Sequence, residues 1–376
     1  MELQSDFNAF LEEIRPTENM RSDCQTGHKT LRERLNADEG LKPILVSDFL
    51  QGSYRRSTAV RPKNGKRSDV DIIVVTKLSE QKYTPKKAMA LFEPFLNRYY
   101  KDKWRPQGRS FGIELSYVDM DLVITSAPSE SDIEILTSEA VKTDDNIASV
   151  MDWRLTPSWI SLQSRAKAFN AKTLLEFAAK EKEWKVKPLR IPDRDAGIWE
   201  DTHPLEQIRW TRDKNKNTNG YFVNIVKCIK WWWLEQLDEP QPPKGFPLER
   251  LIGECCPDGI TAVAEGLVKT LEAIVSNYSF YVVLNTKPKL PDYGVPEHDV
   301  FKRVTVSEFA KFYQCVQTAA TLARRAYDST DRKESGNLWR ELLGNKFPKP
   351  PDNGGSNNSG YTPPTGPATP GSGRFA

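Results

Sequence analysis

The segment SDVDIIVV, residues 68–75, places two aspartates at the start of an otherwise apolar run. The run has the length of a strand and is rich in β-branched residues, which favour a pleated, half-buried surface. Because side chains alternate along a strand, Asp69 and Asp71 share one face, while Val70 and Ile72 share the other. Two neighbouring carboxylates repel each other, and in a half-buried site a cation is needed to keep both ionised. The sequence therefore predicts a cation site on this strand.

A second run with the same alternation, SYVDMDLVIT, follows at residues 116–125. Asp119 and Asp121 share one face of this expected strand, and either could complete a group of three carboxylates with Asp69 and Asp71. Such a group suits Mg²⁺, with Mn²⁺ as the alternative ion, and two ions would hold the attacking and leaving oxygens of a phosphoryl transfer. The third carboxylate would lie near the attacking hydroxyl and accept its proton. The ordinary alternative is that Asp69 caps a loop and Asp71 pairs with an arginine.

A Gly-Ser turn precedes the first acidic strand and follows the apolar run ILVSDFL. Glycine permits a tight backbone path close to a ligand, and the N–H groups and serine hydroxyl at Gly52 and Ser53 can hold phosphate oxygens. Between Arg55 and Arg67 the chain then carries six basic and no acidic side chains. This basic run either attracts a nucleoside triphosphate or forms a solvated hairpin around Pro-Lys-Asn-Gly at residues 62–65.

The order of strand-like and helical patterns along the chain predicts an α+β fold with two lobes. Strand-like runs and one helix alternate up to about residue 127, whereas long helical patterns dominate after residue 150. The final segment is rich in Pro, Gly, Ser and Asn and has too little apolar bulk to order itself. The expected units are an N-terminal helix that bridges the lobes (1–40), a mixed-sheet catalytic core (41–190), a helical substrate-binding lobe (191–347) and a disordered tail (348–376).

Composition narrows the classes of protein to which the chain can belong. Five cysteines are too few for a disulfide framework, and the N-terminus lacks a secretory signal, so we expect a reducing cytoplasm. No apolar run approaches the roughly 20 residues that a membrane span needs. The net charge of +3 is too small to indicate a long nucleic-acid partner.

The stretch GSYRRSTAVRPKNGKRSDVDIIVV, followed by VDMDLVITSAP, resembles the CD-NTase family. These are bacterial relatives of cyclic GMP-AMP synthase and oligoadenylate synthase within the polymerase-β-like nucleotidyltransferases, and the resemblance extends to about residue 345. It implies a two-lobed enzyme that joins NTPs, with ATP favoured and GTP a further candidate, through 3′–5′ bonds into a cyclic di- or trinucleotide. The overall character of the sequence is similar to that of the trinucleotide-forming branch of the family. Such a second messenger would serve antiphage (CBASS) defence.

Matched motif to motif, the resemblance implies a role for each candidate residue of the first lobe. The donor triphosphate would bind at Gln51, Gly52 and Ser53. Asp69 and Asp71 would hold the metal ions. Asp121 aligns better than Asp119 with the family's third acid, which usually precedes a short apolar run and a proline.

The helical lobe offers further candidates. In NIVKCIKWWWLEQL, Lys227 and Lys230 share a helix face at three-residue spacing, and we expect this face to point away from the core. Lys230 resembles the family's lysine that reaches the β- and γ-phosphates, with Lys227 beside it. Successive helical residues diverge by about 100°, so we do not expect residues 231–233, three tryptophans, to face one core. PDYGVPEHDV resembles the loop beside the acceptor nucleotide, which makes Asp292 and His298 candidate contacts.

Three alternatives concern the product and the partners. In part of the family a ubiquitin-transfer-like enzyme conjugates the C-terminal carboxylate, and residues 373–376 could serve in this way, or could be an unstructured end. The same metal geometry also occurs in template-independent enzymes that make linear poly(A) or oligoadenylate. Outside enzymes, the alternative is an inactive scaffold that acts through its tail and tryptophans, but a scaffold has no reason to carry three clustered carboxylates.

Overall fold

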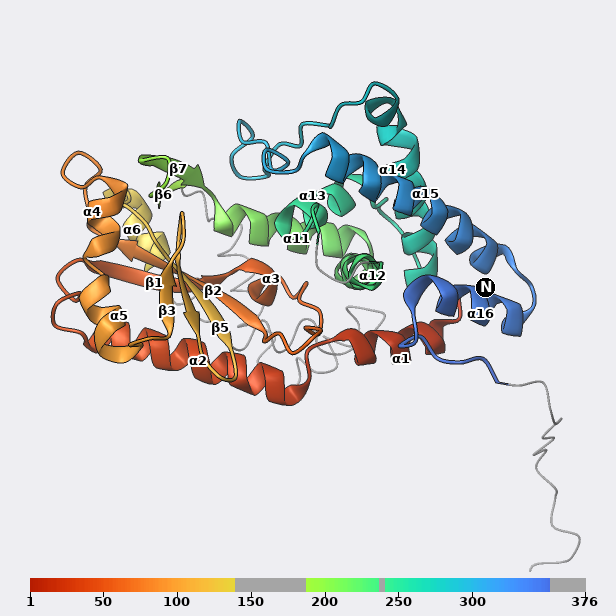
Figure 1. The fold of residues 1–376 in the computed structure, drawn as a ribbon, viewed down its shortest axis with the longest axis horizontal. Helices are drawn as coiled ribbons and strands as arrows, with labels where there is room; N and C mark the ends of the chain where they lie inside the picture. The colour runs from red at the N-terminus through yellow and green to blue at the C-terminus, as the bar shows by residue number, and fades with distance from the viewer. Residues whose placement is uncertain (139–186, 237–240, 352–376) are drawn as a thin grey trace, which may run out of the picture.

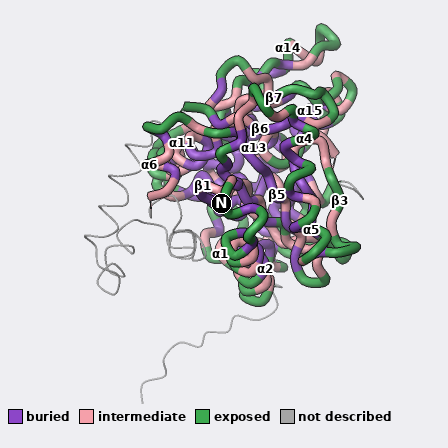
Figure 2. Tube along the Cα trace, turned by 90° about the vertical axis from the view of Figure 1, so that its left-hand side faces the viewer, coloured by how far each residue is buried: buried purple, intermediate pink, exposed green. Residues whose placement is uncertain are grey.

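The computed structural model describes residues 1–138, 187–236 and 241–351, which form two lobes connected by an N-terminal pair of helices (Figure 1). One lobe contains a mixed sheet and the other is helical, so the predicted α+β class is confirmed. Buried residues fill the interior and exposed residues cover the outside (Figure 2). From residue 352 onward, the expected tail lies outside the described residues. No helix among the described residues is long and apolar enough to cross a membrane.

The sheet lies in the lobe that we expect to be catalytic, called the catalytic lobe below. Its strand order is β1-β2-β5-β4-β3. β2 and β5 are parallel, and the other neighbouring pairs are antiparallel, so the sheet is mixed as predicted. The strands are β1 (Leu45–Gln51), β2 (Asp69–Thr76), β3 (Trp104–Pro106), β4 (Phe111–Glu114) and β5 (Asp119–Ile124). The helices of this lobe are α2 (Glu18–Ala37), α3 (Gly52–Arg55), α4 (Pro85–Ala90), α5 (Glu93–Tyr99) and α6 (Glu130–Leu136).

The alternation of β2 decides which face of the sheet carries the acids. Val70 and Ile72 belong to the core that the sheet forms with α2, α4 and α5. Ile73 packs on the opposite face, in a second core with residues of α6. Asp69 and Asp71 have the same parity as Ile73, so they extend from this second face where its apolar cover ends.

A short hairpin, β6 (Leu189–Asp193) and β7 (Ile198–Thr202), covers part of the same second face. Leu189 and Ile191 of β6 belong to the core that contains Ile73. The expected domain boundary at residue 190 therefore falls inside a strand that packs on the catalytic sheet. We propose a boundary after Thr202 instead. The sequence pattern gave no warning of this strand, because Pro192 argues against a sheet position.

Among the described residues, the helical lobe consists of α1 and six further helices around one large apolar core. Their bounds are α1 (Gln4–Ile14), α11 (Pro204–Asn217), α12 (Phe222–Glu235), α13 (Phe246–Cys255), α14 (Val263–Val283), α15 (Val306–Asp328) and α16 (Arg332–Leu343). α12 contacts α1, α11, α13, α14 and α16. Because neighbours surround α12, the tryptophans at 231–233 are all buried, and the prediction that they could not all face a core is wrong.

The N-terminal segment is divided between the two lobes. Phe7 and Phe10 of α1 lie in the core of the helical lobe, whereas Leu31 of α2 lies in the core of the catalytic lobe. Pro16 separates the two helices, and its neighbour Thr17 caps α2 by accepting a hydrogen bond from the Met20 N–H (3.2 Å). The segment therefore runs along both lobes, as Figure 1 shows in red.

Candidate active site

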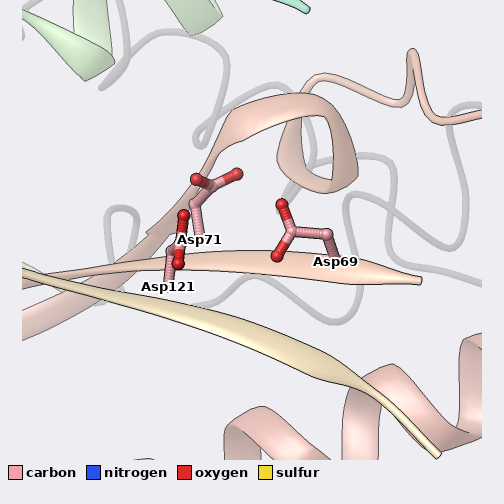
Figure 3. A group of neighbouring side chains, drawn as sticks. All are labelled: Asp69, Asp71 and Asp121. Carbon is pink, nitrogen blue, oxygen red and sulfur yellow. The ribbon is translucent and has the colours of Figure 1, made fainter. Parts of the chain in front are cut away.

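The parallel pairing of β2 and β5 sets the acids of the two strands side by side. Asp69 lies opposite Asp119 in the register, and Asp71 lies opposite Asp121. One carboxylate oxygen from each of Asp69, Asp71 and Asp121 lies within 4.8 Å of the other two, and the three side chains extend to the same side of the strands (Figure 3). In the part of the chain that the structure describes, this is the one group of acidic, His or Cys side chains with such geometry.

Asp119 is directed elsewhere. Its Oδ1 atom accepts hydrogen bonds from the Arg67 guanidinium at 2.7 Å, and the same guanidinium lies 3.9 Å from Glu114. The positive charge of the guanidinium opposes the approach of a metal cation to this carboxylate. The geometry therefore favours Asp121 over Asp119 as the third acid, in agreement with the motif alignment.

Gly52 lies directly against the acidic cluster. It follows Gln51, which pairs with Asp71 across β1 and β2. Gly52 has a φ of +74°, and a Cβ built there would lie 1.7 Å from Oδ2 of Asp71. Only glycine permits both the backbone conformation and the close approach. Gly52 thus borders the carboxylates, and Ser53 follows it in α3. The expected contact of these two residues with a triphosphate stays a prediction.

Desolvation raises the pKa of each of the three acids, and the charges of neighbouring aspartates raise the pKa values of Asp69 and Asp121 further. Desolvation, followed by the charges of Asp71 and Asp121, raises the pKa of Asp69 to about 8. Desolvation and then the charge of Asp71 raise the pKa of Asp121 to about 6. Desolvation also raises the pKa of Asp71, although the charges of Arg56 and Lys230 partly oppose this effect. A site that disfavours its own ionised acids in this way fits a divalent cation, which would keep all three charged.

A buried polar network brings the helical lobe to the edge of this cluster. Glu249 of α13 accepts hydrogen bonds from Arg56 (3.2 Å), Thr58 (2.9 Å) and Lys230 of α12 (3.1 Å). Lys230 also donates to the Thr58 carbonyl at 2.9 Å. Burial alone would raise the pKa of Glu249, but the charges of Arg56 and Lys230 lower it to about 2. The network fixes two cations, both within electrostatic reach of Asp71, between the lobes.

Glu249 is the residue of this network that the sequence patterns missed. It lies between Leu248 and Arg250 on α13 and is only 5% exposed. An acid at a buried position of an amphipathic helix is a signal that sequence reasoning could have used, since buried acids are almost always paired.

Of the remaining candidates from the helical lobe, Lys227 does not lie as expected, whereas contacts of Asp292 and His298 to a nucleotide stay a prediction. Lys227 is fully buried, so the prediction that it lies on an outward face of α12 is wrong, for the same reason as for the tryptophans. Asp292 is half-buried, and its carboxylate accepts hydrogen bonds from Gln207 (2.9 Å) and from the Gly294 N–H (2.8 Å). These contacts stabilise the loop around residues 291–299, where the His298 N–H donates to the Val295 carbonyl and the His298 carbonyl accepts from the Asp292 N–H, both at 2.9 Å.

The basic run at residues 55–67 mainly connects the two lobes. Arg61 donates to the backbone carbonyls of residues 14 and 15 at the end of α1, and Lys63 pairs with Glu235 of α12 at 2.6 Å. The expected tight turn is present, because Asn64 and Gly65 both have positive φ, but no strands flank it. The segment is therefore not a solvated hairpin. Its attraction for a nucleoside triphosphate stays a prediction.

Comparisons with known proteins agree with this geometry. Residues 1–130 match the family model described as the Second Messenger Oligonucleotide or Dinucleotide Synthetase domain. Over the whole length of both chains, the protein is 49% identical to the probable cyclic AMP-AMP-GMP nucleotide synthase of Salmonella paratyphi B. It is 47% identical, again over both whole chains, to the cyclic AMP-AMP-GMP synthase of Enterobacter hormaechei subsp. hoffmannii (strain UCI 50).

A solved structure extends the similarity to the fold. The CD-NTase CdnG of Bradyrhizobium diazoefficiens, solved in complex with GTP, has a TM-score of 0.64 to this protein at 11% identity. The match covers 92% of this chain and 96% of that one. At such low identity the match concerns the fold alone, and it includes both lobes.

A mixed sheet that carries three clustered aspartates beside a Gly-Ser turn, with a helical lobe packed against it, is the arrangement that we expect of a nucleotidyltransferase. Identity across entire chains narrows the class further. The protein belongs to the CD-NTase family of nucleotidyltransferases, and it is an enzyme that joins nucleoside triphosphates into a cyclic oligonucleotide second messenger.

Proposed function

We propose that the enzyme joins two molecules of ATP and one of GTP into cyclic AMP-AMP-GMP, with release of three pyrophosphates. The observation that carries this choice is the identity of 49% and 47%, over entire chains, to two synthases whose names specify that product. Each step would form one 3′–5′ phosphodiester bond and break one bond between the α- and β-phosphates, and the last step closes the ring. The signal would serve antiphage defence in the cytoplasm, where NTPs are available.

We further propose that the group formed by Asp69, Asp71 and Asp121 holds two Mg²⁺ ions. Three hard carboxylate oxygens within 4.8 Å of one another, with raised pKa values, are the donors that this ion prefers. Gly52 fits the same interpretation, because its missing side chain is what leaves room for the Asp71 carboxylate. When bound, the ions would supply charge stabilisation for the attacking and leaving oxygens.

The roles of the side chains follow from their positions. Asp121 would accept the proton of the attacking 3′-hydroxyl, because its carboxylate lies beside Asp69 and Asp71, where the proposed ions would bind that hydroxyl. The backbone N–H groups and hydroxyl at Gly52 and Ser53, with Gln51 beside them, would hold the donor triphosphate. Lys230 would exchange one of its contacts to Glu249 or Thr58 for the β- and γ-phosphates.

Mass spectrometry of the products tests the proposed reaction. Wild-type enzyme, ATP, GTP and Mg²⁺ should yield a ring of two AMP units and one GMP unit that resists phosphatase and exonuclease. Asp69→Asn with Asp71→Asn should abolish the product, whereas Asp102→Asn, on an exposed loop of the same lobe, should not. A phosphatase-sensitive ladder would favour a linear polymerase, a ring of AMP alone would correct the base choice, and full activity of the double variant would refute the assignment.

We also propose that a ubiquitin-transfer-like enzyme conjugates the C-terminal carboxylate. The support is the resemblance of the family and the composition of residues 348–376, which lack the apolar bulk to pack. Deletion of residues 360–376 should leave nucleotide synthesis unchanged and remove any covalent adduct formed with the conjugating enzyme. An adduct that survives the deletion would show that the C-terminus is not the attachment point.

A further inference from the structure

A glutamine outside the three-acid group contacts one of its members. Gln107 lies in the loop between β3 and β4, and its Nε2 atom donates a hydrogen bond to Oδ1 of Asp121 at 3.2 Å. The contact is favoured by the sheet, because Gly112 of β4 lies opposite Asp121 in the antiparallel register of β4 and β5. Nothing in the local sequence pattern assigns a role to this residue.

The orientation of the Gln107 amide is fixed by a second hydrogen bond. The Ser110 hydroxyl donates to Oε1 of Gln107 at 2.9 Å, and Ser110 is only 7% exposed. Because an ionised carboxylate only accepts hydrogen bonds, whereas a hydroxyl can donate to the amide oxygen, the NH₂ group is the end that faces Asp121. The Gln107 N–H also donates to the Ser110 carbonyl at 2.8 Å, so the loop is closed around this pair.

The surroundings leave room for this amide and restrain the loop that carries it. A Cβ at Gly112 would lie 2.5 Å from Nε2 of Gln107, so a larger residue there would displace the amide. The adjacent Gly108 carbonyl accepts a hydrogen bond from the Arg194 N–H at 2.7 Å. Arg109 pairs with Asp193 of β6 at 3.0 Å, which attaches the loop to the hairpin β6–β7.

Asp119 provides an internal comparison on the same strand. Its partner is the Arg67 guanidinium, a full positive charge that neutralises the carboxylate and competes with a metal ion. The partner of Asp121 is a neutral amide, which can orient a carboxylate without supplying a charge. An amide that binds one oxygen leaves the other oxygen, and the negative charge, available to a cation.

We propose that Gln107 is a positioning residue that orients Asp121 toward the metal ions, with Ser110 holding the amide in the required orientation. The inference rests on the proposed role of Asp121 in the metal site. Partners that orient metal ligands in this way typically contribute about 10–100-fold to metal affinity or activity. A merely structural role in the loop would leave metal affinity unchanged.

The test uses Gln107→Met, which keeps the chain length and removes the NH₂ donor, and Gln314→Met, on an exposed position of α15, as the matched control. Mn²⁺ affinity is measured from the electron paramagnetic resonance signal of the free ion. Initial rates of nucleotide synthesis are measured at varied concentrations of Mg²⁺ and of ATP, which gives kcat and KM. Gln107→Met should weaken Mn²⁺ binding and raise the Mg²⁺ concentration at half-maximal rate by about 10–100-fold. The KM for ATP at saturating metal should stay near that of the control.

A second variant protects the test against misfolding. Ser110→Ala retains the side chain of Gln107 but releases its amide, so it should lose metal affinity in the same direction and to a smaller extent. If Gln107→Met has a lowered melting temperature, the metal affinity of Ser110→Ala tests the positioning role instead. Wild-type metal affinity in both variants, while Asp121→Asn loses affinity and activity, would overturn the positioning role alone. An active Asp121→Asn enzyme would instead refute the proposed metal site itself.

Discussion

Replacement of Gly52 by alanine should lower kcat by about 100-fold and cost about 1–2 kcal/mol in the free energy of unfolding. The added Cβ would lie 1.7 Å from Oδ2 of Asp71. Because real Cβ atoms essentially never approach another heavy atom within 3.0 Å, the carboxylate must move by more than 1 Å. A displacement of this size at a catalytic centre can cost about 100-fold in rate. Alanine at a φ of +74° also costs about 1–2 kcal/mol in backbone strain.

Gly65 offers a matched control for that experiment. It has a φ of +70°, and nothing lies within 4 Å of a Cβ built there. Gly65→Ala should therefore lose about the same 1–2 kcal/mol in the free energy of unfolding, because the backbone strain is the same. Chemical denaturation measures the stability of both variants, and pyrophosphate release measures kcat. Equal activity of the two alanine variants would refute the conclusion that Gly52 makes room for Asp71.

Three further predictions concern the acids of the two lobes. Asp121→Asn should lower kcat by about 10²–10⁴-fold, whereas Asp119→Asn should remain within a few-fold of the wild type; the reverse order would exchange their roles. Without metal, stability should fall as the pH rises from about 4 to 8, because folded Asp69 keeps its proton up to a pKa of about 8 and the unfolded chain loses it near 3.8. Melting temperatures across that range should show the fall, and Mg²⁺ should reduce it; a stability that rises over this range would contradict the raised pKa. Glu249→Ala should cost about 3–5 kcal/mol on denaturation, because two buried cations lose their acid; a loss below about 1 kcal/mol would contradict the pairing.

The clustering of the three acids was predictable because it depends on short-range alternation. Two strands with acids at alternate positions can bring those acids to one face whichever way the strands pair, so Asp69, Asp71 and a third acid could be predicted together. The choice between Asp119 and Asp121 could not be made from alternation, since it depends on the position of Arg67, which only the folded loop determines.

Residues whose partners are distant in the chain escaped prediction. Glu249 contacts Arg56 across 193 positions, and the pattern of α13 does not indicate which cation it meets. The outward position predicted for Lys227 is wrong because helical periodicity describes a helix with one buried and one exposed face. α12 instead has neighbouring helices on all sides, so this lysine is buried. Helical periodicity indicates faces correctly only when one side of the helix is left to solvent.

The break between α1 and α2 has a mechanical consequence for turnover. Arg15 and Thr17 have extended backbone conformations on either side of Pro16, while the helices themselves are packed into different lobes. Arg61 holds this joint through two hydrogen bonds to the backbone, from its N–H to residue 14 (2.6 Å) and from its guanidinium to residue 15 (3.0 Å). A swivel of one lobe against the other, to admit substrates in turn and release a ring, would bend this three-residue joint together with the second crossing of the chain after Thr202.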